Sequence, residues 1–152
     1  MARLIKAFWF VTVLATFASL LYVYASIPEM VNILTREDRV DSLVVSRDTL
    51  FYVTLALTAF SNFVLYSIYR SLNNRANRKY RYAPTLIKWV LSFGAVLNLF
   101  FIVCMQFITL YNSGENFNYD NFGYLIYVTG GFIIIWLISL PISFLFKPKT
   151  TA

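Results

Sequence analysis

The stretch WVLSFGAVLNLFFIVCMQFITLYNSG, residues 89–114, runs for 26 residues without a charged side chain. A helix needs about 20 mostly apolar residues to cross the roughly 30 Å hydrocarbon layer of a bilayer. Three further stretches meet that length without a charge: Ala7–Pro28, Thr49–Tyr69 and Asn121–Phe146. All 20 charged residues fall between or beside these four stretches. The sequence therefore predicts an all-α integral membrane protein, a bundle of four transmembrane helices, and excludes a soluble globular domain.

We expect a single membrane domain over residues 1–152. The predicted helices cover about 4–26, 49–70, 84–111 and 122–146, and they are joined by an outer loop 27–48, a basic cytoplasmic loop 71–83 and an outer turn 112–121. Arg3 and Lys6 at the start of the chain also suit the positive n-region of a signal peptide. The apolar run that follows them is longer than the usual h-region of about 7–15 residues, so we expect a helix that is retained in the mature protein.

The charged residues predict the orientation. Ten basic and no acidic residues occupy the N-terminus, the middle connection and the tail. The other two connections hold all seven acids and only three arginines. Because Lys and Arg in short loops stay on the cytoplasmic side, both termini and the middle loop are expected in the cytoplasm. We expect the membrane to be a bacterial-type inner membrane. The basic residues flank apolar segments, so we expect no nucleic-acid partner.

Aromatic residues near the helix ends support the same frame. Phe8, Trp9, Tyr66 and Trp89 stand near the basic side, where amphipathic rings favour the headgroup layer. We therefore assign Trp9 and its neighbours to an interfacial belt.

The residue types exclude several kinds of chemistry. The chain has no histidine, which removes Ser-His and Cys-His nucleophile pairs and His-ligated metals. Its one cysteine, Cys104, lies in an apolar stretch and is best explained as a small filler between helices. No Asp, Glu, Lys, Arg or His lies in the middle of a predicted span, which argues against a proton- or sodium-coupled pump. We expect no cofactor and no catalytic residues.

Polar side chains inside the spans are the first candidates for a functional role. Asn62 lies on the second predicted helix, and Asn98 and Gln106 lie on the third. The depths of the two asparagines differ by roughly 5 Å at 1.5 Å per residue, so an interhelical amide contact is within reach. Such a contact fixes helix register; the alternative is a polar ligand or transport site at mid-membrane. Gly94 and the pair Gly130-Gly131 are expected to let helix backbones approach closely.

Two extramembrane surfaces are candidate contact regions. The basic loop offers cations for anionic lipid headgroups or an acidic partner: Arg70, Arg75, Arg78, Lys79 and Arg81. The outer loop offers a mixed-charge surface: Glu29, Arg36, Glu37, Asp38, Arg39 and Asp41. Its carboxylates suit an acid/base pair or a cation site, but the interspersed arginines favour mutual ion pairing.

The outer loop also contains apolar residues that a solvated linker would not need. We expect a short amphipathic piece and an extended piece to fold over the outer mouth of the bundle. Ser46 is placed to cap the second helix, with Asp48 in its first turn.

Three dipeptides in the outer loop carry a family resemblance: Ile27-Pro28, Asp41-Ser42 and Ser46-Arg47. Their order resembles that in small bacterial membrane proteins related to the sporulation-delaying-protein immunity factor. The glycine and the aromatic or histidine residues that this family has in between are missing here. The resemblance implies toxin immunity or signal sensing through the outer face.

The function expected from these observations is non-enzymatic. We expect an accessory or partner-binding subunit of a membrane complex, in contact with the bilayer, with anionic headgroups on the cytoplasmic side and with a protein partner. Small-molecule transport, sensing or immunity is one alternative. A membrane enzyme that uses the outer carboxylates is another.

Overall fold

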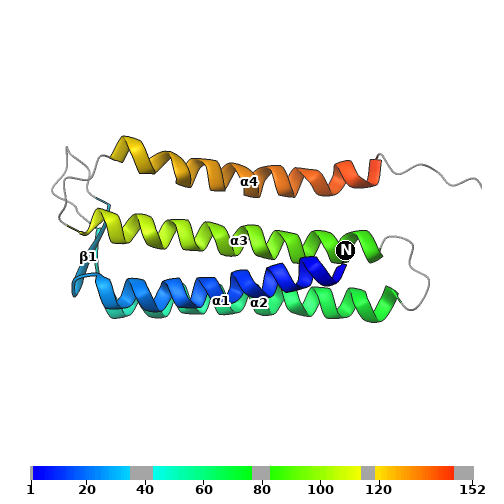
Figure 1. Cartoon of the computed structure of the whole chain (residues 1–152), viewed down its shortest axis with the longest axis horizontal. Helices are drawn as coiled ribbons and strands as arrows, with labels where there is room; N and C mark the ends of the chain where they lie inside the picture. The colour runs from blue at the N-terminus through cyan, green and yellow to red at the C-terminus, as the bar shows by residue number, and fades with distance from the viewer. Residues whose placement is uncertain (1, 35–42, 77–82, 114–118, 146–152) are drawn as a thin grey trace, which may run out of the picture.

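A computed structural model describes residues 2–34, 43–76, 83–113 and 119–145, which form four long helices and one strand pair. In chain order the elements are α1 (Ala2–Ser26), β1 (Met30–Leu34), β2 (Leu43–Ser46), α2 (Arg47–Ala76), α3 (Ala83–Tyr111) and α4 (Tyr119–Leu145). The helices lie side by side along the long axis of the molecule (Figure 1). Each contains a segment long and apolar enough to cross a membrane. The prediction of four such helices is confirmed.

The helix ends follow from local sequence. α1 ends at Ser26, where Pro28 disfavours a helical conformation in the residue before it. Ser46 caps α2, because its Oγ accepts a hydrogen bond from the backbone N–H of Thr49 at 3.2 Å. Asp48 lies in the first turn of α2, where the positive end of the helix dipole stabilises a carboxylate. The cap predicted at Ser46 is therefore present.

α3 is the central helix of the molecule. It packs against α1, α2 and α4, and Figure 1 shows it between α4 and the pair formed by α1 and α2. α1 and α2 also contact each other, so α1, α2 and α3 form a three-helix core. Toward one end the buried residues of this core are apolar: Leu20, Val23, Ile27, Val31 and Met105.

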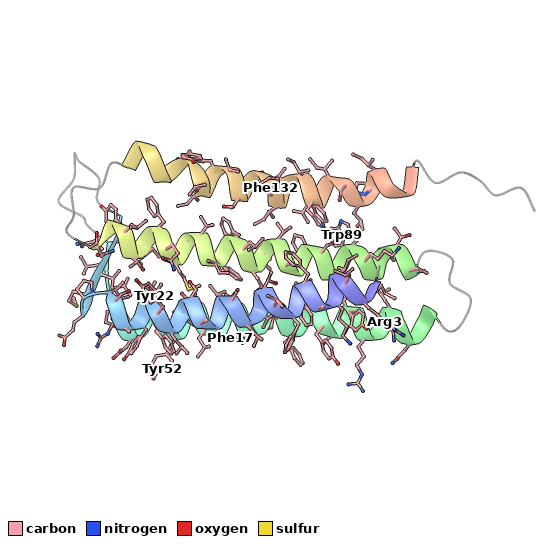
Figure 2. All side chains as sticks on the ribbon, viewed as in Figure 1. Arg3, Phe17, Tyr22, Tyr52, Trp89 and Phe132 are labelled. Carbon is pink, nitrogen blue, oxygen red and sulfur yellow. The ribbon has the colours of Figure 1, made fainter. Side chains whose placement is uncertain are left out.

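α4 is attached to the rest of the molecule through α3. The indole N–H of Trp89 donates to the backbone oxygen of Trp136 at 3.0 Å and to Ser139 Oγ at 3.2 Å. Figure 2 shows Trp89 in the space between the two helices. None of the described side chains of α4 is fully buried. A Cβ built at Gly130 or Gly131 would meet nothing within 4 Å, so the expected close backbone approach at this glycine pair is wrong.

The two apolar runs of the outer loop are both strands. β1 and β2 pair antiparallel, with Met30 opposite Ser46 and Val31 opposite Val45. Val31 is fully buried against the apolar end of the three-helix core, so the hairpin covers that end as expected. The separate amphipathic piece is wrong for the described residues, because the first run pairs with the second. We call this end of the bundle the hairpin end, and the opposite end, where α1 begins, the basic end.

Candidate functional site

Asn62 of α2 and Asn98 of α3 form a reciprocal amide pair inside the three-helix core. Asn62 Nδ2 donates to Asn98 Oδ1 at 2.8 Å, and Asn98 Nδ2 donates to Asn62 Oδ1 at 3.2 Å. The side chain of Asn98 has no exposed surface, and Asn62 is also buried. A buried amide is costly unless each of its polar atoms has a partner. The pair therefore fixes the register of α2 against α3 in an apolar interior.

Side chains of α1 extend the pair into a network. Trp9 Nε1 donates to Asn62 Oδ1 at 3.1 Å, and Asn98 Nδ2 donates its second proton to Thr12 Oγ1 at 3.3 Å. Thr16 Oγ1 reaches the backbone oxygen of Asn98 at 3.4 Å. We call these five residues the amide network. It joins all three core helices at one level of the bundle.

The amide donors of the network are fully used. Asn62 Nδ2 gives its other proton to the backbone oxygen of Thr58 at 2.9 Å, so both N–H groups of Asn62 and both of Asn98 have acceptors within the protein. An amide offers no more than two N–H donors. The arrangement therefore has no amide N–H left over for a ligand.

Thr58, which lies beside the network, has a buried side-chain hydroxyl without a described partner. Its side chain is fully buried, yet Oγ1 has no hydrogen-bond partner among the described atoms. The hydroxyl thus contributes packing volume rather than a hydrogen bond, and it offers a matched control for the network residues.

Gln106 lies away from the amide pair. Its Nε2 donates to Ser19 Oγ of α1 at 3.1 Å, and the eight residues that separate it from Asn98 correspond to about 12 Å along the helix. It also lines a cavity of about 80 Å³ beside Val103 and Leu125, between α3 and α4. The structure brings together two of the three predicted polar residues and holds the third in a separate interhelical contact.

Asn112, just beyond α3, fastens the hairpin to the core. Its Oδ1 accepts from the backbone N–H of Asn32 at 2.8 Å, and its Nδ2 donates to the backbone oxygen of the same residue at 3.0 Å. The amide thus pairs with β1 as a neighbouring strand would. Nδ2 also reaches the backbone oxygen of Ile108 at 2.8 Å. Sequence reasoning missed this contact, because Asn112 stands in a polar stretch that is typical of an ordinary turn.

A polar recess of about 360 Å³ opens at the hairpin end, and its described lining residues are Glu29, Met30, Ser46, Arg47 and Asp48. The hydroxyl of Tyr24 donates to Asp48 Oδ1 at 3.0 Å. The Arg47 guanidinium lies 4.8 Å from the centre of the Tyr24 ring, a cation–π arrangement. Side chains of both charges therefore meet in one open recess.

The remaining predicted contact residues are placed only in part. Glu29 lines the hairpin recess, whereas Arg36, Glu37, Asp38, Arg39 and Asp41 lie outside the described residues. Arg70 is exposed on α2, and Arg75 belongs to the last turns of the same helix. Arg78, Lys79 and Arg81 lie outside the described residues. Within the described part of the chain, no three His, Cys, Asp or Glu side chains are grouped so as to hold a metal.

Trp9 is the network member that sequence reasoning assigned elsewhere. Its ring N–H donates to Asn62 inside the bundle, a contact that the sequence did not predict, and its place in an interfacial belt stays a prediction. Its α1 partners, Thr12 and Thr16, also went unpredicted. The available signal was their i, i+4 spacing, which puts both hydroxyls on one face of the helix.

Comparisons of the chain with family models, with curated proteins and with solved structures found no match. The site therefore has to be interpreted from its own geometry.

Proposed function

We propose that this chain is a four-span protein of a bacterial-type inner membrane that acts as a non-enzymatic, partner-binding subunit of a membrane complex. Its termini and basic loop face the cytoplasm, and its hairpin faces outward. The four long apolar helices and the one-sided distribution of Lys and Arg support this arrangement.

The observation that carries the partner-binding role is an apolar surface on the hairpin. Met30 is 61% exposed and Val44 is 39% exposed. Met30 pairs with Ser46 and Asn32 pairs with Val44, so alternation places Met30 and Val44 on the same face of the hairpin, in strands that follow α1 and precede α2. In the proposed arrangement lipid tails cover the exposed apolar residues of the helices but not those of the hairpin. Exposed apolar groups beside a charged recess are typical of a protein-binding surface.

Transport of a polar solute has less support. A polar mid-membrane pathway needs groups that solute or water can reach, whereas the amide network is buried and its amide donors are taken within the protein. Catalysis by the outer carboxylates also has less support, because Asp48 already accepts the Tyr24 hydroxyl beside the Arg47 guanidinium. Immunity through the outer face is one form of the proposed partner binding, and it too would use the hairpin.

Thiol labelling in intact cells tests the orientation. In a Cys104→Ala background, Leu43→Cys is expected to react with a membrane-impermeant maleimide added from outside. Asn74→Cys, an exposed position near the end of α2, is expected to react only after the membrane is opened. The reverse pattern would invert the proposed topology, and labelling of both positions in intact cells would contradict the four spans.

Photo-crosslinking tests the partner surface. A photoreactive amino acid at Met30 is expected to give a discrete protein adduct in membranes, because the side chain lies exposed beside the hairpin recess. The adduct should disappear when Glu29→Arg and Asp48→Arg reverse the charges of that recess. Phe60, which is exposed on α2 between the two ends, is the matched control and should react with lipid alone. Lipid adducts alone at Met30 would contradict the proposed function.

A further inference from the structure

A second recess, of about 310 Å³, lies at the basic end among three helices. Its polar lining comes from Arg3 and Lys6 of α1, Asn73 of α2 and Lys88 of α3. The apolar part of the lining includes Ile87 and Leu91, which are both buried. Arg3 is labelled in Figure 2 at the end of the bundle where α1 begins. Cations from two separate helices therefore meet over an apolar floor.

Among the residues that the structure describes, no acid lines this basic recess or belongs to the basic end. The described acidic residues, Glu29, Asp48 and Asp120, all belong to the hairpin end or to the first turn of α4 beside it. The ammonium group of Lys6 lies 5.5 Å from the centre of the Tyr69 ring, a contact that holds the cation at the recess wall without neutralising it. α1 and α3 begin at this end and α2 ends there, so two positive helix ends outweigh one negative end and the balance favours an anion.

The depth of the recess suits a lipid headgroup. Lys6 and Lys88 lie within the first two turns of their helices. At 1.5 Å per residue these positions are about 6–8 Å from the helix starts, close to the thickness of one headgroup layer. A phospholipid presents a phosphate to the lysines and apolar glycerol and acyl carbons to the floor. A soluble phosphate would leave that floor uncovered.

We propose that the basic recess binds the phosphate headgroup of an anionic phospholipid from the adjoining leaflet. This inference rests on the proposed membrane insertion, and it goes beyond diffuse attraction by the basic loop, because it assigns the lipid to a defined place between α1, α2 and α3. Lys6 and Lys88 contact the phosphate, and the exposed lining residue Pro84 contacts the glycerol region.

The experiment titrates a short-chain fluorescent phosphatidylglycerol into the detergent-solubilised protein, with the phosphatidylcholine analogue as reference. Lys88→Gln and Lys6→Gln are each expected to weaken phosphatidylglycerol binding about fivefold, since one lysine near an anionic headgroup contributes that factor. Arg70→Gln removes the same charge from an exposed residue of the predicted lipid-contacting set that does not line the recess. It therefore measures the diffuse attraction, and it should change binding less than twofold. Unchanged unfolding temperatures of the variants in neutral detergent show that the fold is intact.

Three outcomes would overturn the proposal. Equal losses in Lys88→Gln and Arg70→Gln would mean diffuse charge attraction. Because both lipids carry a phosphate, equal binding of the two would mean that the recess does not select the net negative charge of the headgroup. Displacement of the lipid by inorganic phosphate alone would assign the recess to a soluble anion. Flotation of the protein with phosphatidylcholine vesicles tests insertion separately: a chain that floats but shows no lipid preference contradicts this inference alone, and a chain that does not float contradicts the proposed function.

Discussion

Replacement of Asn98 by leucine is expected to lower the free energy of unfolding by about 1–3 kcal/mol, the cost of leaving buried polar partners unsatisfied. The substitution keeps the side chain's approximate volume but removes an acceptor from Asn62 Nδ2 and a donor from both Asn62 Oδ1 and Thr12 Oγ1. Asn62 Oδ1 keeps its hydrogen bond from Trp9, and Thr12 Oγ1 keeps its bond to the backbone oxygen of Trp9, so one buried N–H of Asn62 is the group that loses its partner. Thermal or SDS-induced unfolding in detergent micelles, followed by circular dichroism, measures the loss.

Thr58→Val is the matched control for this prediction. It removes a hydroxyl from the same level of the core, but that hydroxyl has no described partner, so we expect no loss of stability or a small gain. The double variant Asn62→Leu/Asn98→Leu should lose less stability than the sum of the losses in the two single variants. Each single variant leaves the other amide without its partner, whereas the double variant removes both amides. Equal losses for Asn98→Leu and Thr58→Val, or strict additivity of the pair, would contradict a structural role for the network.

The long apolar segments of this chain were predictable because a bilayer imposes one strong requirement on sequence. A run of 26 residues without charge, such as residues 89–114, is typical of a membrane-spanning helix. The bounds of α3 lie within a few residues of those predicted. The depth argument for Asn62 and Asn98 worked for a similar reason. Helix rise is constant, so two positions counted from the same end lie at comparable levels.

The contacts that sequence reasoning missed depend on which faces of the helices meet. Tryptophan near the end of a predicted span is typical of the membrane interface. The packing of α1 on α2 and α3 is what directs the ring N–H of Trp9 to Asn62. Asn112 fastens β1 through an amide that any turn asparagine offers. The strand pair joins two segments that are separated by residues 35–42 in the sequence. A local sequence pattern does not predict that these two segments pair.

Gly94 and Gly130 look alike in the sequence, but their surroundings in the structure differ. Gly94→Ala is expected to destabilise the fold by up to about 2 kcal/mol, because overpacking a well-filled core costs about 1–3 kcal/mol and the gain in helix propensity offsets only about 1 kcal/mol. The new Cβ would stand 2.8 Å from both Cδ1 and Nε1 of Trp9 and 3.2 Å from Leu65 Cδ1. The indole cannot withdraw freely, because it donates to Asn62 and stacks on Tyr66 with ring centres 6.2 Å apart. The methyl group therefore has to displace α1 or break the network.

Gly130→Ala is the matched control, since it makes the same chemical change in α4 where a Cβ would meet nothing within 4 Å. We expect it to be neutral or to stabilise the helix by up to about 1 kcal/mol, the difference in helix propensity between glycine and alanine. Trp9→Leu should absorb part of the Gly94→Ala loss, because the smaller side chain vacates the contested space, and the double variant should then be less destabilised than the sum of the singles. Thermal unfolding in one detergent compares the wild type with Gly94→Ala, Gly130→Ala, Trp9→Leu and the double variant. Equal stabilities of Gly94→Ala and Gly130→Ala, or a Gly94→Ala loss that does not depend on Trp9, would contradict the packing of α1 on α3 through this indole. The hydrogen bond from Trp9 to Asn62 would then also be wrong.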